Sequence, residues 1–143
     1  MEFRPFRGDD LLLAALGEVS VAGEGAGITL RLTPGPAALN PGGFIHGGTL
    51  AALFDVTLYE AARAGFAAAT VTSALELKFL RAGEPDAALY ITADVLRAGR
   101  SQSVFSGSAW QKDRLIAFAT AQFTRVAPPS TPDKRSSDDR PDP

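Results

Sequence analysis

The sequence is poor in the residues that most often carry metal and redox chemistry. Its 143 residues include no cysteine and a single histidine, His46. The absence of cysteine excludes disulfides, thiolate metal sites and a cysteine nucleophile. Protein zinc sites draw most of their ligands from histidine and cysteine, so one chain of this composition is not expected to build one. We therefore expect a protein that works without a metal ion.

Long apolar runs and an excess of positive charge are also missing. No apolar stretch approaches the roughly 20 residues that a membrane helix needs. The first ten residues, MEFRPFRGDD, carry charges where a secretory signal peptide has its apolar core. The net charge is −2 and no basic stripe appears, so neither nucleic acid nor a membrane is an expected partner. These features favour a cytoplasmic location.

The composition and length of the chain are sufficient for one domain with a hydrophobic core. Hydrophobic residues make up 45% of it, and its length fits a single domain. Residues 9–16 are expected to form a short helix capped by Asp9 or Asp10. Residues 18–33 alternate apolar and polar on both sides of Gly-Glu-Gly, which predicts a hairpin. A loop with three prolines follows over residues 34–43.

Residues 47–64 are the best candidate for a long helix. Apolar residues fall at helical spacing along this segment, at Leu50, Leu53, Phe54, Leu58 and Ala61. Alanine and other small residues fill much of the rest, and Gly65 is the expected terminator. A helix that is apolar or small on nearly all sides is buried rather than lying on a surface.

After this helix, apolar and polar residues alternate with a period of two. Alternating segments separated by turn residues cover residues 70–83, 86–100, 101–113 and 114–126, which predicts four antiparallel strands. One long helix with a sheet of this size predicts an α+β architecture, in which an antiparallel sheet wraps around a central helix, as in the hotdog fold. The domain is expected to cover residues 1–126. Residues 127–143 hold no large apolar side chain and are predicted to be disordered.

The only histidine lies at the start of the predicted long helix, in the stretch NPGGFIHGGTLAALFD (40–55). Nine residues separate His46 from Asp55, which is roughly 13 Å along a helix axis. The two side chains therefore do not reach one small group within one chain. In the simplest interpretation neither residue is functional: His46 is a loop residue bonded to the backbone, and Asp55 is an isolated polar residue on the helix. However, a carboxylate among apolar neighbours is costly unless it is paired or faces a wet cleft.

A second subunit gives these residues a function. A one-helix core is thin and its sheet keeps an open edge, so at least a dimer is expected. Two antiparallel central helices would bring Asp55 of one chain to the helix start of the other. The N–H groups of Gly47 and Gly48 are expected to be free there, at the positive end of the helix dipole. They would polarise a carbonyl, while the carboxylate attacks it or activates water.

These residues resemble a known family, the hotdog-fold acyl-CoA thioesterases of the phenylacetic-acid-degradation type. The residues that carry the resemblance are Asn40, the triplet His46-Gly47-Gly48 and Asp55. Ser73 follows on the next predicted strand, and a Gly-basic-Ser turn matches Gly99-Arg100-Ser101. The resemblance covers roughly residues 10–126.

The resemblance implies a role for each of these residues. Asp55 would be the nucleophile or general base, and Gly47 would polarise the thioester carbonyl. His46 would hold the loop, Asn40 would position water or the carbonyl, and Ser73 would orient the water. Coenzyme A, as part of the substrate and not a separate cofactor, would lie along the subunit interface against Gly48, Gly99, Arg100 and Ser101. Arg81 and Arg97 are weaker candidates than Arg100 for contacting the CoA phosphates. Both are better interpreted as solvated residues at strand ends.

Acyl-CoA hydrolysis is the leading hypothesis, and two others stay open. One is a hotdog dehydratase acting on (3R)-hydroxyacyl thioesters, in which the histidine is the base. The other is a protein that binds acyl-CoA without turnover. The acyl pocket is expected to be lined by Phe54, Leu58 and Phe79. Aryl-acyl and medium-chain groups both fit, and a homodimer or a homotetramer made as a dimer of dimers is expected.

Overall fold

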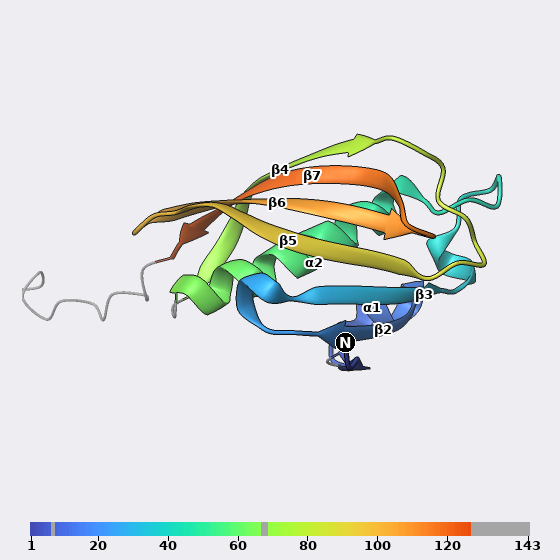
Figure 1. The fold of residues 1–143 in the computed structure, drawn as a ribbon, viewed down its shortest axis with the longest axis horizontal. Helices are drawn as coiled ribbons and strands as arrows, with labels where there is room; N and C mark the ends of the chain where they lie inside the picture. Colours follow the sequence, from blue (N-terminus) through green and yellow to red (C-terminus); the bar gives the residue numbers. More distant parts are fainter. Residues whose placement is uncertain (7, 67–68, 127–143) are drawn as a thin grey trace, which may run out of the picture.

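A computed structural model describes residues 1–6, 8–66 and 69–126 (Figure 1). The elements are β1 (Arg4–Pro5), α1 (Leu11–Leu16), β2 (Gly17–Ala22), η1 (Gly25–Gly27), β3 (Thr29–Pro34), η2 (Pro36–Ala38), α2 (Gly47–Phe66), β4 (Thr70–Phe79), β5 (Leu89–Ala98), β6 (Gln102–Gln111) and β7 (Arg114–Arg125). Apart from the two-residue β1, this order is the predicted one. The predicted disordered tail, residues 127–143, lies outside the described residues.

The strands form one sheet in the order β1-β2-β3-β5-β6-β7-β4, and every pairing is antiparallel. The sheet curves around α2, which runs along its concave side (Figure 1). β4 follows α2 in sequence but pairs only with β7, so it forms one edge of the sheet. This antiparallel sheet around one central helix confirms the predicted α+β hotdog fold.

α1 has the predicted cap. Asp10 is its N-cap, and the Asp10 carboxylate accepts a hydrogen bond from the Leu13 N–H at 3.1 Å. Gly17 ends the helix and begins β2. This cap satisfies one of the free N–H groups that every helix start leaves.

α2 is buried where it crosses the sheet. Its apolar residues at helical spacing, Leu50, Leu53, Phe54, Leu58 and Ala61, are all buried in the core. Gly107 of β6 lies beneath the helix, and a Cβ at that position would come within 2.9 Å of the Phe54 ring. Glycine is thus required at 107 because the helix packs this closely onto the strand.

The predicted end of α2 was wrong by two residues. Gly65 lies inside the last turn, and the helix ends at Phe66. Phe66 is half-buried and packs against the core, which keeps the last turn in helical conformation in spite of the glycine. The stabilisation from this contact outweighs the helix penalty of glycine, about 1 kcal/mol.

Candidate active site

A tight loop precedes α2 and positions its start. The side-chain oxygen of Asn40 accepts from the Phe44 N–H at 3.1 Å, and the Asn40 N–H donates to the Phe44 carbonyl at 2.8 Å. The N–H groups of Ile45 and His46 donate to the carbonyls of Gly83 and Ala38, each at 2.8 Å. These bonds tie the loop to two neighbouring segments, so the helix start has a fixed position.

His46 caps the helix with its side chain. Its Nδ1 accepts a hydrogen bond from the Gly48 N–H at 2.9 Å. Only an unprotonated ring nitrogen accepts, so this hydrogen bond requires Nδ1 without a proton. The prediction of a free Gly48 N–H was therefore wrong, because the neighbouring histidine occupies it. Among the described residues, no acceptor meets the N–H of Gly47.

Asp55 lies in the middle of α2 and faces the edge strand β4. The carboxylate is half-buried, and its Oδ1 accepts from the Thr72 hydroxyl at 2.7 Å. No other partner of Asp55 lies within residues 1–6, 8–66 and 69–126, which leaves its Oδ2 open to a ligand. Thr57, the next polar residue on α2, instead bonds the Leu53 carbonyl of its own helix at 2.7 Å.

Ser73, the residue expected to orient the water, forms its hydrogen bonds with β7. The β4–β7 register shifts between Thr72 and Ala74, so Ser73 is the extra residue of a β-bulge. Its hydroxyl donates to the Gln122 carbonyl at 3.1 Å and accepts from the Thr124 hydroxyl at 2.8 Å. The hydroxyl that contacts Asp55 is that of Thr72, because the bulge shifts the side-chain alternation by one residue.

The open Gly47 N–H and the Asp55 carboxylate lie far apart in one chain. Gly47 packs against Phe79 at the end of β4, whereas Asp55 contacts Thr72 near its beginning. The eight residue steps from Gly47 to Asp55 correspond to roughly 12 Å along the axis of α2. A single protomer therefore does not bring the two groups to one small substrate group.

The predicted Gly99-Arg100-Ser101 turn joins β5 to β6. A Cβ on Gly99 would come within 2.5 Å of the Gln102 carbonyl oxygen, so the turn needs glycine there. Figure 1 shows this turn at the opposite end of the sheet from the start of α2. The Arg125 N–H donates to the Ser101 carbonyl at 2.8 Å, which places Arg125 beside the turn.

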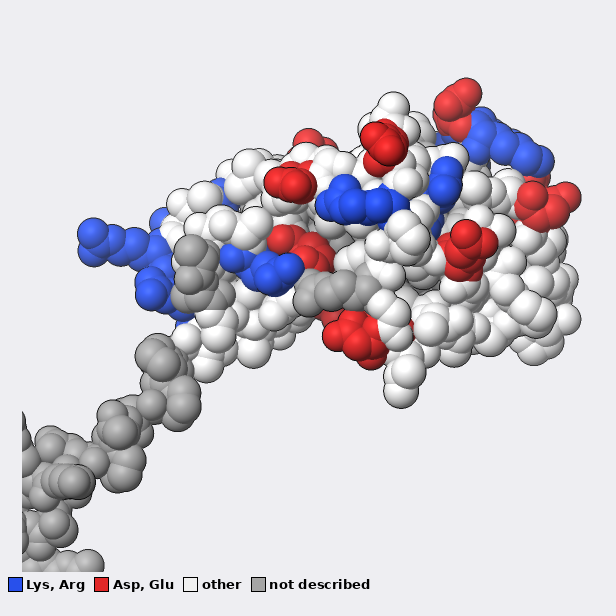
Figure 2. Space-filling model, turned by 90° about the horizontal axis from the view of Figure 1, so that it is seen from below, with Lys and Arg blue, Asp and Glu red and all other residues white. Residues whose placement is uncertain are grey.

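Arg97 near the end of β5, Arg100 in the turn and Arg125 at the end of β7 are all exposed, and we call these three residues the basic cluster. Within the part of the chain that the structure describes, none of the three guanidinium groups pairs with an acid. Over most of the face shown in Figure 2, positive and negative side chains are interspersed. Unpaired guanidinium groups suit the binding of phosphate.

A pocket of about 440 Å³ opens beside the start of α2. It is lined by Asn40, Phe44, Ile45, Gly47, Leu50, Phe79, Leu80, Arg81, Ala82 and Gly83. Phe79 was predicted to line the acyl pocket and does line this one. Phe54 and Leu58 do not, because both are fully buried in the core against Gly107.

Arg81, at the rim of this pocket, is exposed and donates to the Leu115 carbonyl at 2.8 Å.

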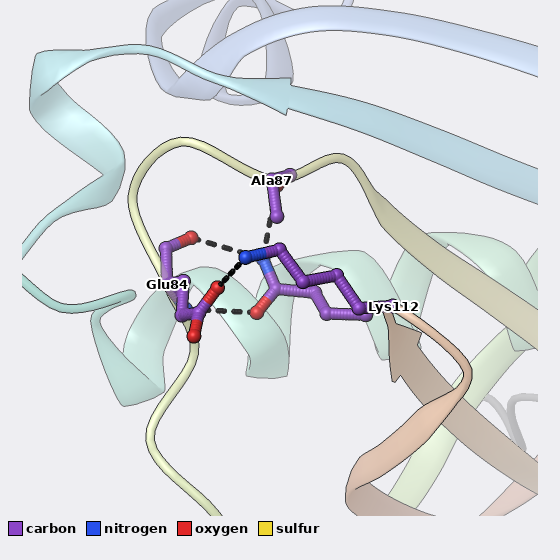
Figure 3. Close-up of polar contacts among 4 residues, drawn as sticks. Glu84, Ala87 and Lys112 are labelled. Atoms are coloured by element: carbon purple, nitrogen blue, oxygen red, sulfur yellow. Dashed lines mark hydrogen bonds and ion pairs between the residues drawn. The ribbon is translucent and has the colours of Figure 1, made fainter.

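A buried glutamine fixes the loop that follows this pocket wall. Gln111 at the end of β6 accepts from the Glu84 N–H at 2.8 Å and donates to the carbonyls of Glu84 and Ala87, each at 2.9 Å (Figure 3). Lys112 forms an exposed ion pair with Glu84, and the hydrogen bond and charge of Glu84 raise the pKa of Lys112. Sequence analysis did not identify Gln111, because a polar residue in an alternating strand is expected to face the solvent.

The described residues hold no group of three His, Cys, Asp or Glu side chains arranged to bind a metal ion. Among the same residues, no helix has the length and apolar character to cross a membrane.

The fold and the open amide at its helix start define a hotdog protein with a candidate acyl site. A family model of the thioesterase superfamily matches residues 42–117, which is more than half of the chain. The chain therefore belongs to the thioesterase superfamily. No curated protein sequence matches it significantly.

Solved structures confirm the resemblance seen in the sequence. The PaaI protein from the phenylacetic acid degradation operon of E. coli is 25% identical, with a TM-score of 0.76, over 83% of this chain and 86% of that one. The conserved protein PA5202 from Pseudomonas aeruginosa is 28% identical, with a TM-score of 0.74, over 85% and 95%. The BH2602 protein from Bacillus halodurans, solved with CoA, is 24% identical, with a TM-score of 0.67, over 71% and 69%, and shares the fold.

Proposed function

We propose that this protein is an acyl-CoA thioesterase that hydrolyses its substrate at a site shared between two subunits. The observation that carries the proposal is the unpaired N–H of Gly47, which opens on a pocket at the start of a buried helix. Membership of the thioesterase superfamily supports thioester hydrolysis as the general activity. CoA as the carrier is motivated by the neighbour of the same fold that was solved with it.

The helix start supplies the electrophilic half of the mechanism. The thioester oxygen would accept from the Gly47 N–H, where the helix dipole favours the negative charge that develops on it. His46 positions this amide by capping the same turn through Gly48. The Asn40 oxygen is used by Phe44, so its NH₂ group is the part left to contact the carbonyl or a water.

Asp55 supplies the other half. As a general base, it takes a proton from water, the hydroxide adds to the carbonyl carbon, and the C–S bond breaks as the CoA thiolate takes up a proton. As a nucleophile, it displaces the thiolate directly and forms an anhydride that water then hydrolyses. In both cases Thr72 holds Oδ1 and leaves Oδ2 to react.

The free edge of β4 offers a way to join the halves. β4 has ten residues and, among the residues that the structure describes, no partner on its outer side. If two copies pair there antiparallel about the middle of the strand, the Thr72 end of one strand lies beside the Phe79 end of the other. Asp55 of one subunit then faces Gly47 of its partner. The same pairing covers an edge that natural proteins rarely leave open.

The basic cluster at Arg97, Arg100 and Arg125 is assigned to the phosphates of CoA. The turn that carries this cluster lies at the opposite end of the sheet from Gly47 of the same subunit. Antiparallel pairing of two β4 strands would bring that end of the sheet toward the start of α2 in the partner. Aryl-acyl and medium-chain thioesters are the proposed substrates. The homodimer is the minimal active unit, and a dimer of dimers is proposed for the whole assembly.

The first test measures thiol release from phenylacetyl-, benzoyl- and hexanoyl-CoA by the wild type and by Asp55→Asn. We expect turnover by the wild type and a loss of about 1000-fold or more in the variant, which lacks the carboxylate base or nucleophile. Asp94→Asn, at an exposed position of β5, is the matched control and should keep wild-type activity. Formation of an enoyl thioester, or binding without release, would contradict the proposal.

A second test addresses the shared site. Gly47→Pro, which removes the N–H at the first helical position where proline is tolerated, and Asp55→Asn, each expected to be inactive alone, are unfolded and refolded together in equal amounts. A mixed dimer holds one site with an intact Asp55 and an intact Gly47, so random mixing should restore about a quarter of the wild-type rate. A mixture of Asp55→Asn with Asp55→Ala should stay inactive. Activity no higher in the first mixture than in the second would exclude the shared site.

A further inference from the structure

The ring of Phe79 lies directly against Gly47. A Cβ on Gly47 would sit 3.2 Å from Phe79 Cζ and 3.6 Å from each Cε. Gly47 does not have a positive φ, so the backbone conformation alone does not require glycine there. The missing side chain instead leaves space that the Phe79 ring occupies, next to the unpaired N–H.

Phe79 shares the pocket with a second aromatic ring. The side chains of Phe79 and Phe44 are 58% and 47% exposed, although both line the same 440 Å³ pocket. Among the described residues the two rings make no ring contact with each other. Buried Ile45 and Leu50 complete its apolar lining. An apolar group held between two rings is what this lining accommodates.

The backbone that carries Phe79 is fixed. Phe79 pairs with Ala117 of β7, and the next two N–H groups, of Leu80 and Arg81, both donate to the Ile116 carbonyl, at 2.8 and 3.1 Å. The Phe79 ring can therefore turn about its own side-chain bonds but cannot move away with its strand. A wall of this kind selects ligands by shape.

We propose that Phe79 determines acyl specificity by excluding branching at the carbon next to the thioester carbonyl. This inference rests on the proposed thioesterase function and on the Gly47 amide as the carbonyl donor. A carbonyl hydrogen-bonded to Gly47 brings its adjacent carbon beside the ring. A flat or unbranched acyl group passes between the two rings, whereas a methyl branch on that carbon meets the Phe79 ring.

The test compares two pairs of CoA thioesters that differ in branching, butyryl with isobutyryl and phenylacetyl with 2-phenylpropanoyl. For the wild type we expect kcat/KM to favour the unbranched member about tenfold or more, the scale that one methyl group sets in a fitted pocket. Phe79→Ala should bring each ratio close to one, and Phe79→Leu should give an intermediate value. Phe79→Trp should increase the preference.

The control is Phe118→Ala, which removes an exposed ring from neighbouring β7 outside the pocket and should keep the wild-type ratio. Circular dichroism and thermal unfolding establish that each variant is folded. If the wild type releases thiol but does not discriminate, or if Phe79→Ala leaves the ratios unchanged, the inference fails and the thioesterase function stands. If the wild type releases thiol from none of these substrates or of the first panel, both fail.

Discussion

The two halves of the candidate site are built in different ways. The amide half-site, which comprises Asn40, His46, Gly47 and the wall at residues 80–83, consists of loops held by many short hydrogen bonds. The carboxylate half-site, which comprises Asp55 and Thr72, consists of two regular elements joined by a single side-chain bond. The amide half-site acts through an uncharged N–H group, whereas the carboxylate half-site acts through a charge that one side-chain hydrogen bond orients.

This difference matches what each half has to do. A group that stabilises a developing oxyanion must already be in place when the charge appears, and a network of backbone bonds provides this preorganisation. A carboxylate that takes and returns a proton needs one oxygen held and the other free. We therefore expect substitutions in the amide half-site to lower activity by disturbing its structure. Substitutions in the carboxylate half-site should lower activity by removing a reacting group or its hydrogen bond.

The largest effect on stability should come from Gln111→Ala. Gln111 is 3% exposed, and its loss leaves the Glu84 N–H and the carbonyls of Glu84 and Ala87 without partners. We expect the free energy of unfolding to fall by about 2–4 kcal/mol, measured by urea denaturation. Thioesterase activity should fall as well, because the clamped loop follows the pocket wall, although Gln111 does not line that pocket.

Lys112→Ala is the matched control, since Lys112 also binds Glu84 but through an exposed ion pair. Glu84 raises the pKa of Lys112, so any stabilisation from the pair is present below the pKa of the unfolded lysine. It is lost only as the pH rises through the higher folded pKa. Between pH 6 and 9 the variant should unfold at the wild-type urea concentration. A loss equal to that of Gln111→Ala would contradict the assignment of the clamp to the glutamine.

The fold was predictable because its signals are local and repeated. The alternation of the four strands and the helical spacing from Leu50 to Ala61 each extend over ten or more residues, so single exceptions do not obscure them. The end of α2 was not predictable in the same way. It depends on the contact of Phe66 with a core that is assembled from distant strands.

The placement of His46, Gly47 and Gly48 at one helix start was predictable for the same reason, since the three residues are adjacent in sequence. Even there, the hydrogen bond from Gly48 to the His46 ring was missed, because it depends on a side-chain rotamer. Thr72 was missed because a bulge at Ser73 shifts the alternation, and strand pairing with β7 sets that bulge. The sequence pattern contains no sign of that pairing.

Thr72→Val tests the carboxylate half-site. It keeps the shape of the side chain and removes the hydroxyl that donates to Asp55. Loss of a hydrogen bond to a charged group costs about 1.5–3 kcal/mol, so we expect kcat to fall at least tenfold with little change in KM. Thr72→Ser should restore it.

Ser73→Ala is the control for Thr72→Val and should keep kcat within about twofold, as its hydroxyl bonds only to β7. If Ser73→Ala loses more activity than Thr72→Val, the bulge does not decide which hydroxyl serves Asp55. The serine suggested by the family resemblance would then be the positioning residue.

The smallest effect is expected at His46, whose ring caps α2 through Gly48. His46→Ala removes the cap and should lower the free energy of unfolding by about 1 kcal/mol. His46→Asn supplies another capping oxygen and should recover most of that loss, together with thioesterase activity, if the role of His46 is to hold the amide half-site in place. If instead His46→Asn is as stable as the wild type but inactive, the imidazole itself takes part in the chemistry. Urea unfolding and thiol release measured on the same preparations separate the two roles, and the second outcome would bring back the reaction in which this histidine is the base.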